Sequence, residues 1–259
     1  MKTILAGLCL SVLLAIASVA QAATVLVTGS NRGLGLEFVR QYAADGWTVI
    51  ATARNLGDAD ELKALAAKHK NVQLKTLDVI DAASLKALAQ DLKGVPIDVL
   101  INNAGVLGAK ADQRMGALSH EAFDQVMGVN TFAPLAISDA LLENVAASEQ
   151  KKIIAITSGS GQLAPGGGGN EIYFYNASKA ALNMVMRRFA FDVRPRGVII
   201  GLIAPGAVDT DMRREVVGDA AARDLRPEQS IGGMRQVIER LSMAKSGAFL
   251  NYDGREVPW

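Results

Sequence analysis

Short apolar runs alternate along the chain with segments in which apolar residues recur every three or four positions. A short apolar run predicts a buried strand, and the wider spacing predicts an amphipathic helix. The expected strands cover residues 24–28, 47–53, 72–77, 97–101, 152–157, 198–203 and 247–250. The expected helices cover residues 33–44, 60–68, 84–92, a long segment from Ser119 toward Ala147, 175–193 and 231–241. Asp81 and Ser119 are expected to cap the third and fourth helices.

The regular alternation of strand and helix indicates βαβ units and a parallel sheet that is covered on both faces. Right-handed crossovers then give a doubly wound sheet, which binds ligands at the carboxyl ends of its strands. We therefore expect an α/β fold: a single doubly wound Rossmann domain over residues 23–259, with a seven-stranded, mainly parallel sheet. Residues 159–172 and 205–229 are expected to be long loops that shape a substrate pocket.

The first residues have a different pattern. Lys2 precedes an apolar run over residues 4–19, and the small-x-small sequence Ala20-Gln21-Ala22 follows. This pattern is typical of a secretory signal peptide, here residues 1–22, and the run is short for a membrane-spanning helix. An uncleaved anchor and a misassigned start codon are the alternatives. We expect an exported or periplasmic protein with no membrane segment after cleavage, or a cytoplasmic one if the signal is not real.

Composition narrows the class of protein. The 259 residues include 27 basic and 26 acidic side chains, and this balance argues against a nucleic-acid-binding protein. Cys9 is the single cysteine, which excludes an internal disulfide and a cysteine-based metal cage. His69 and His120 stand apart from any carboxylate–histidine cluster, so we expect surface residues and no metal site.

A glycine-rich turn follows the first expected strand and opens the first helix: Thr28-Gly29-Ser30-Asn31-Arg32-Gly33-Leu34-Gly35. A pyrophosphate needs backbone N–H donors that it can approach closely, and it gains from the positive end of a helix. Gly29 suits the tight turn, Gly33 the close approach and Gly35 the packing of helix on sheet. The spacing is G-x-x-x-G-x-G, and glycines at such a turn are in other cases only structural.

The end of the second expected strand indicates the cofactor. An acidic residue there would bind a ribose 2′-hydroxyl and repel a 2′-phosphate, but this chain has Ala51-Thr52-Ala53-Arg54. Arg54 and Arg32 are available to bind a phosphate, so we favour NADP(H) over NAD(H). Two solvated surface arginines are the alternative. Asp78 either accepts from an adenine amino group or caps the next turn.

Tyr175 and Lys179 stand four residues apart, on one face of an expected helix. A nearby ammonium favours the phenolate, so we expect Lys179 to lower the pKa of Tyr175 and the pair to exchange a proton with a carbonyl oxygen. Tyr173 has no lysine four residues later. A tyrosine and a lysine at this spacing are, alone, a weak signal.

Several motifs strengthen that signal by their order. The turn at Thr28, the run Asn102-Asn103-Ala104-Gly105, then Asn130, Ser158, Tyr175, Lys179 and Pro205-Gly206 follow one another as they do in short-chain dehydrogenases/reductases, which the chain resembles from Thr24 to Trp259. Tyr173-Phe174-Tyr175 and the ending Ser246-Gly247-Ala248-Phe249-Leu250-Asn251-Tyr252-Asp253-Gly254-Arg255-Glu256-Val257-Pro258-Trp259 resemble the C-factor branch of that family.

The resemblance implies a role for each motif residue. Tyr175 is the general acid or base, Lys179 tunes it and binds the nicotinamide ribose, Ser158 stabilises charge on the substrate oxygen, and Asn130 holds a proton-relaying water. Ser160 is a rival for Ser158. Asn102 to Gly105 brace the sheet near the adenosine, and Thr210 contacts the nicotinamide amide. The cofactor contacts implied are Gly29, Asn31, Arg32, Gly33, Leu34, Gly35, Arg54, Asp78, Val79, Asn103, Ala104, Gly105, Tyr175, Lys179, Pro205, Gly206, Val208 and Thr210.

The motifs and the resemblance are compatible with two functions. The first is an NADPH-dependent oxidoreductase that interconverts a carbonyl and an alcohol by hydride transfer, with a small-molecule substrate. The second is a C-factor-like signalling or binding protein that keeps the dinucleotide fold with little or no turnover. The resemblance also allows a homo-oligomer.

Overall fold

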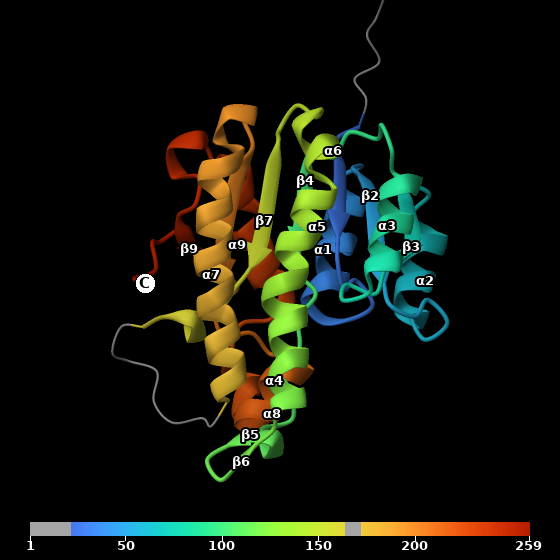
Figure 1. The fold of residues 1–259 in the computed structure, drawn as a ribbon. Coiled ribbons are helices and arrows are strands. Elements are labelled where there is room, and N and C mark those ends of the chain that lie inside the picture. Colours follow the sequence, from blue (N-terminus) through green and yellow to red (C-terminus); the bar gives the residue numbers. More distant parts are fainter. Residues whose placement is uncertain (1–21, 164–171) are drawn as a thin grey trace, which may run out of the picture.

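One seven-stranded sheet organises the computed structural model, which describes residues 22–163 and 172–259 (Figure 1). Its strands are β1 (Thr24–Val27), β2 (Thr48–Ala53), β3 (Val72–Thr76), β4 (Val99–Asn102), β7 (Lys152–Ile156), β8 (Ile199–Ala204) and β9 (Phe249–Asn251). They lie in the order β3-β2-β1-β4-β7-β8-β9, and every pairing between neighbours is parallel. The expected doubly wound Rossmann fold is confirmed.

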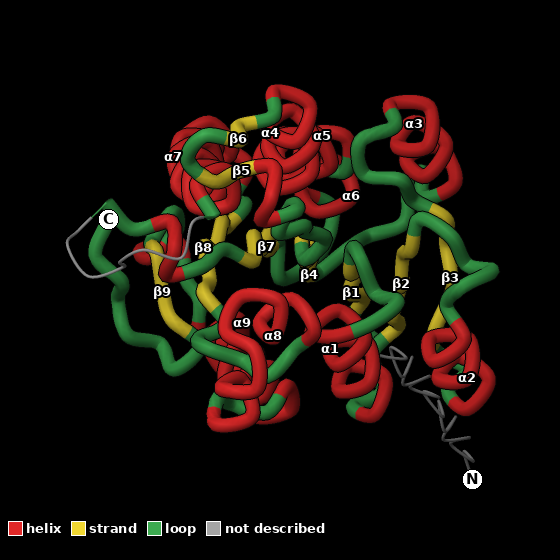
Figure 2. Tube along the Cα trace, turned by 90° about the horizontal axis from the view of Figure 1, so that it is seen from below, coloured by secondary structure: helices red, strands yellow, loops and turns green. Residues whose placement is uncertain are grey.

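Helices cover both faces of the sheet (Figure 2). One face carries α1 (Gly33–Ala44), α2 (Asp60–Lys68), α8 (Asp211–Val217) and α9 (Pro227–Arg240). The other carries α3 (Ala82–Asp91), α4 (His120–Met127), α5 (Ala133–Ala140), α6 (Leu142–Ala146) and α7 (Tyr173–Val193). Two hydrophobic cores result, one on each side of the sheet.

Burial on both faces explains the apolar runs of the strands. In β1, Val25 and Val27 belong to one core and Leu26 to the other, and all three side chains are 0% exposed. A strand packed by helices on both sides needs no polar face, so its sequence is continuously apolar rather than alternating.

The expected caps are confirmed. The side chain of Asp81 accepts from the N–H of Ala83 at 2.9 Å, and that of Ser119 accepts from the N–H of Ala122 at 3.2 Å. Each side chain satisfies one of the amide groups that have no intrahelical acceptor at a helix start.

The expected helix from Ser119 to Ala147 is broken. A π-helical turn (Gly128–Phe132) separates α4 from α5, and Leu141 separates α5 from α6. Pro134 has no N–H to give to the carbonyl four residues earlier, which is that of Asn130. The α-helical ladder is therefore interrupted at Asn130.

The expectation of a long loop over residues 205–229 was wrong. This stretch contains α8, a 3₁₀ segment (Gly218–Arg223) and the start of α9 at Pro227. Thr210 caps α8, and proline suits the first turn of a helix, where its missing N–H costs nothing. The other expected loop, 159–172, falls partly on residues 164–171, which lie outside the described residues.

A small antiparallel hairpin of β5 (Gln113–Arg114) and β6 (Ala117–Leu118) was not expected. It lies at the end of the molecule where α4 and α7 begin (Figure 1). The predicted signal peptide falls almost wholly on residues 1–21, outside the described part of the chain. Within residues 22–163 and 172–259, no helix has the length and apolarity needed to cross a membrane.

Candidate active site

The turn between β1 and α1 requires its glycines. Gly29 and Gly33 have φ angles of +66° and +56°, in the left-handed region that side chains disfavour. A Cβ on Gly29 would lie 2.9 Å from the Cα of Ala104. A Cβ on Gly35 would lie 2.1 Å from the carbonyl oxygen of Gly29, so the helix could not approach the turn.

The end of β4 holds this turn in place. The side-chain amide of Asn103 donates to the carbonyls of Thr28 at 2.9 Å and Gly29 at 3.1 Å. In return, the hydroxyl of Thr28 accepts from the N–H groups of Asn103 and Ala104, both at 3.0 Å. From β1 the strands are added outward to β3 on one side, and from β4 they are added on the other side. Folds of this kind bind ligands at the point between β1 and β4 where that order reverses.

The first turn of α1 leaves donors for an anion. Its N-cap residue, Arg32, makes no side-chain cap, so the first N–H groups of the helix lack a side-chain acceptor. These groups and the positive end of the helix dipole fit a pyrophosphate. The Arg32 side chain is 73% exposed and lies 3.8 Å from Asp211, the first residue of α8.

Arg54 is exposed immediately after β2. The N–H of Ser30 donates to the carbonyl of Thr52 at 2.8 Å, which ties the glycine turn to the end of that strand. Both arginines thus lie at one edge of the sheet. Asp78 is half-buried, and one of its carboxylate oxygens accepts from the N–H of Ile80 at 3.2 Å, which is the turn-capping role.

Tyr175 lies in the first turn of α7, against the end of β7. Burial raises the pKa of its hydroxyl above 10.0, while a hydrogen bond with the Ser158 side chain lowers it. The Ser158 oxygen also accepts from the N–H of Ser160 at 3.1 Å, so it both caps a turn and contacts the tyrosine. Ser158, and not Ser160, is the serine that affects the pKa of Tyr175, and its catalytic role stays a prediction.

Lys179 is buried one helical turn beyond Tyr175. Its Nζ donates to the carbonyl of Ile156 at 3.0 Å and lies 5.7 Å from the centroid of the Tyr175 ring. Burial lowers the pKa of Lys179 to about 8. The expectation that Lys179 lowers the pKa of Tyr175 was wrong: the pKa of the tyrosine is raised, because burial has the largest effect at both groups.

Asn130 is fully buried in the π-helical turn and uses its whole side chain. Its amide exchanges two hydrogen bonds of 2.8 Å with the backbone of Val106, and it also donates to the hydroxyl of Ser178 at 3.0 Å. That hydroxyl in turn donates to the carbonyl of Tyr175 at 2.8 Å. A Cβ on Gly105 would lie 3.3 Å from the Asn130 oxygen and 3.8 Å from the Lys179 nitrogen.

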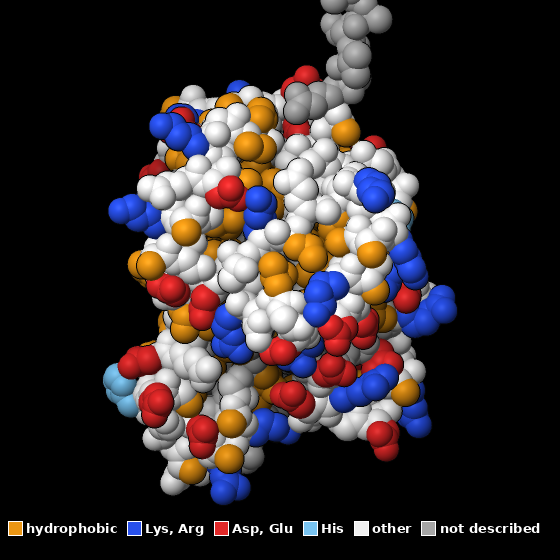
Figure 3. Space-filling model, turned by 90° about the vertical axis from the view of Figure 1, so that its right-hand side faces the viewer, with side chains coloured by type: hydrophobic (Ala, Val, Ile, Leu, Met, Phe, Trp, Pro, Cys, Tyr) orange, Lys and Arg blue, Asp and Glu red, His pale blue; other side chains and the backbone are white. Residues whose placement is uncertain are grey.

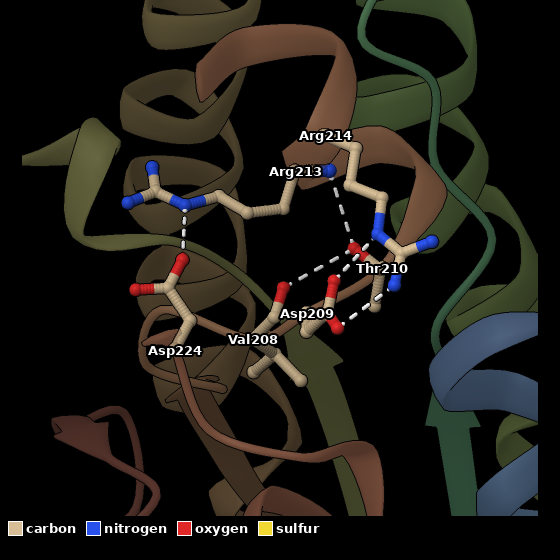
Figure 4. A network of polar contacts seen from close by, with 6 residues as sticks. All are labelled: Val208, Asp209, Thr210, Arg213, Arg214 and Asp224. Atoms are coloured by element: carbon tan, nitrogen blue, oxygen red, sulfur yellow. Dashed lines mark hydrogen bonds and ion pairs between the residues drawn. The ribbon is translucent and has the colours of Figure 1, made fainter. Parts of the chain in front are cut away.

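The segment after β8 carries Thr210 at the start of α8 (Figure 4). The Thr210 hydroxyl accepts from the N–H of Arg213 at 3.2 Å and donates to the carbonyl of Val208 at 3.4 Å. Arg213 pairs with Asp224 and Arg214 with Asp209, which fastens α8 on two sides. Thr210 is thus a helix cap here, and its contact with the nicotinamide amide stays a prediction.

The sequence-predicted residues therefore form two groups. Tyr175, Lys179, Ser158, Asn130 and Gly105 are brought together by contacts among themselves or their immediate neighbours. The glycine turn, Asn103 and Ala104 form the second group beside β1 and β4. The carbonyl of Pro205 accepts from the hydroxyl of Ser230 at 2.7 Å. Asn31 makes no side-chain hydrogen bond within residues 22–163 and 172–259, and the side chains of Leu34, Val79 and Val208 are apolar.

Two residues at the site were not identified from the sequence. Ser178 stands inside the quoted run from Tyr175 to Lys179, so that motif held the available signal. Gln113 accepts from the N–H groups of Phe174 and Tyr175, and no pattern in its surroundings indicates this. No group of three potential metal ligands occurs among the described residues.

Comparison with known proteins gives the family. A family model for short chain dehydrogenases matches residues 23–221. A Schizosaccharomyces pombe protein described as an uncharacterised oxidoreductase is 32% identical over 248 residues, covering 90% of this chain and 96% of that protein. The C-signal protein of Myxococcus xanthus is 37% identical over 175 residues, covering 68% of this chain and 100% of that protein. NADPH-bound carbonyl reductase from chicken fatty liver has a TM-score of 0.83 at 35% identity, covering 92% of this chain and 100% of its own.

The chain therefore belongs to the short-chain dehydrogenase/reductase family, and it is an NAD(P)-dependent oxidoreductase of that family. The resemblance to the C-factor branch is confirmed by the likeness to C-signal.

Proposed function

We propose that this protein reduces a small ketone or aldehyde with NADPH, or oxidises the corresponding alcohol, and that Tyr175 transfers the proton. The observation that carries the proposal is the cluster of Tyr175, Ser158 and Lys179. The Ser158 side chain lowers the pKa of the tyrosine hydroxyl, and the lysine ammonium lies 5.7 Å from the tyrosine ring centroid.

The reducing direction requires Tyr175 in its protonated form. Burial keeps the hydroxyl protonated at neutral pH, so it is ready to donate to the carbonyl oxygen as that oxygen becomes an alkoxide. The Ser158 hydroxyl hydrogen-bonds to the same oxygen and stabilises its developing charge. Lys179, with its pKa lowered to about 8, is able to return a proton to the tyrosine near neutral pH.

The residues around β1 and β4 fit a nicotinamide dinucleotide. The glycine turn leaves the space that a Cβ would fill, and the first turn of α1 supplies N–H donors for the pyrophosphate. Bound NADPH supplies the hydride that reduces the carbonyl carbon. Arg32 and Arg54 hold the 2′-phosphate, and no acidic residue at the end of β2 repels it.

The test is NADPH oxidation by the mature chain over a panel of ketones and aldehydes, beside Tyr175→Phe. We expect kcat to fall by about 10²- to 10⁴-fold, because the phenyl ring has no proton to transfer. Tyr173→Phe is the matched control, since Tyr173 is 48% exposed and has no lysine one turn later. A Tyr175→Phe enzyme with wild-type kcat would contradict the proposal.

The cofactor preference has its own test. Arg54→Asp should weaken NADPH binding about tenfold or more and affect NADH much less, because it exchanges a charge-assisted phosphate bond for repulsion. Arg240→Asp makes the same change of charge on an exposed residue at the end of α9. Dissociation constants for both cofactors decide the matter, and equal losses for NADPH and NADH would contradict the preference.

The likeness to C-signal favours a second candidate function, a protein that binds the dinucleotide and signals with little turnover. A binder has no need of the complete cluster of Tyr175, Lys179, Ser158 and Asn130. Tight NADPH binding without turnover of any carbonyl would favour this second function.

We also propose that residues 1–22 are a signal peptide. Cleavage after Ala22 would preserve the pairing of the first strand. The carbonyl of Ala23 accepts from the N–H of Thr48 at 2.9 Å, and the N–H of Thr24 donates to Asp98 at 2.8 Å.

A further inference from the structure

We propose that Gln113 is a positioning residue for Tyr175: it fastens the backbone of the proton donor to the loop that follows β4. The inference rests on the proposed function, because it matters for the reaction only if Tyr175 transfers the proton.

The burial of Gln113 is unusual for its location. It begins the hairpin β5–β6, where Met115 is 82% exposed and Leu118 is 63% exposed, yet Gln113 itself is 0% exposed. A buried amide is costly unless its donors and its acceptor are satisfied. The side chain of Gln113 therefore has a defined set of partners.

The oxygen of that amide caps α7 from outside the helix. It accepts from the N–H of Phe174 at 3.0 Å and from the N–H of Tyr175 at 3.3 Å. These N–H groups belong to the first turn of the helix, where no intrahelical carbonyl is available. The N-cap residue, Ile172, has no side chain able to take them, so Gln113 supplies the missing acceptor.

The nitrogen of the same amide binds the loop after β4. It donates to the carbonyls of Leu107 at 3.0 Å and Gly108 at 3.2 Å. Gly108 has a φ of +76°, and a Cβ there would lie 3.1 Å from this nitrogen and 2.6 Å from Val126. The loop is thus shaped to receive the amide.

These bonds close a ring around the Tyr175 peptide. On the N–H side, Gln113 connects Tyr175 to Leu107 and Gly108. On the carbonyl side, Ser178 connects Tyr175 to Asn130, which is paired with Val106. Both routes lead to residues 106–108, so the proton donor is fixed to one loop from two directions.

A primary amide is the group this position requires. It presents an acceptor to two N–H groups and a donor to two carbonyls, whereas a carboxylate only accepts and a hydrocarbon does neither. The loss of these bonds would let the start of α7 shift relative to Ser158. A misplacement of about 1 Å at a reacting group costs on the order of a hundredfold in rate.

The test compares Gln113→Met and Gln113→Glu with wild type, on protein whose folded state is confirmed by circular dichroism. We expect kcat to fall about ten- to a hundredfold in Gln113→Met while the dissociation constant of NADPH stays within about twofold, because the glycine turn is untouched. Gln113→Glu keeps the acceptor for Phe174 and Tyr175, so its kcat should lie between those of wild type and Gln113→Met.

Asn144→Leu is the matched control for lost stability. Asn144 is 8% exposed, and its amide bridges the carbonyls of Leu92 at 2.6 Å and Val95 at 2.8 Å, far from Tyr175 in the fold. Its substitution should lower the melting temperature and leave kcat unchanged. Equal kcat in Gln113→Met and wild type, or equal losses in Gln113→Met and Asn144→Leu, would overturn the inference.

Tyr175→Phe separates this inference from the proposed function. If Tyr175→Phe is inactive and Gln113→Met is fully active, the positioning role fails while the proposed function stands. If Tyr175→Phe keeps wild-type kcat, the proposed function itself fails.

Discussion

At the scale of single residues, burial shapes the chemistry of the site more than charge does. Tyr175 and Lys179 lie close together, yet the pKa of each is displaced toward the neutral form by removal from water. A neutral tyrosine is an acid, which suits reduction. An ammonium with a pKa of about 8 is held at a cost to folding, because the unfolded chain binds that proton more tightly.

This cost predicts that Lys179→Met stabilises the fold while it removes activity. The folded pKa of about 8 lies below the ordinary 10.5, so the unfolded state binds more protons and the wild type loses stability as pH falls from 10.5 to 8. At pH 7 the variant should gain about 2 kcal/mol in the free energy of unfolding, after allowance for the unsatisfied carbonyl of Ile156.

Urea denaturation of both proteins at pH 7 and at pH 10.5 checks this prediction. The gain should disappear at the higher pH, where the lysine is neutral in the folded state and only half protonated in the unfolded state. A Lys179→Met protein less stable than wild type at pH 7 would show that the ammonium stabilises the fold.

Sequence patterns identified residues whose partners are near in the chain, such as the Tyr175–Lys179 pair, and glycines at a turn between a strand and a helix. Gly29, Gly35 and Lys179 were predicted from their spacing, and the contacts of the glycines explain why no other residue fits. Asn130 was indicated by the family resemblance, because its partners Val106 and Ser178 are distant in the chain. Gln113 was not predicted, since its acceptor serves N–H groups 61 and 62 residues later. An isolated glutamine in a polar stretch has no periodicity that could reveal such a partner.

At the scale of elements, the strands and the long helices followed from the sequence because they face a core. Helices α1 and α2 have the predicted bounds, since their apolar spacing matches one buried face. The short helix α8 was missed because none of its residues is buried and it is held by polar contacts: the Thr210 cap and two ion pairs. Hydrophobic periodicity carries no information about an element of this kind.

The break at Asn130 is the opposite case, because the sequence contains a residue that predicts a break in the helix. Pro134 stands four residues after Asn130, and proline interrupts the hydrogen-bond ladder at that distance. The interruption coincides with the turn that carries Asn130 to Val106 and Ser178. A local disruption of the helix therefore serves the ring of hydrogen bonds around Tyr175.

At the scale of the whole molecule, the site spans both sides of the sheet. Helix α7, which bears Tyr175, covers one face, while α1 and α8 cover the other (Figure 2). Polar contacts hold α8 to other parts of the site: Arg32, the N-cap residue of α1, pairs with Asp211, and Lys110, in the segment after β4, donates to the carbonyl of Val216 at 3.3 Å. The face in Figure 3 has basic and acidic side chains interspersed, so no broad field of one sign covers it.

We expect residues 1–22 to direct export of the whole protein. Residues 1–23, fused to a reporter that needs disulfides formed outside the cytoplasm, should confer reporter activity. The same fusion with Leu13→Arg and Leu14→Arg, which interrupts the apolar run, should not. The exported full-length chain should begin at Ala23 by mass spectrometry, and its melting temperature should rise on addition of NADPH, because a ligand that binds only the folded state stabilises it. Reporter activity confined to a cytoplasmic reporter would contradict export and would leave the enzyme in the compartment where NADPH is made.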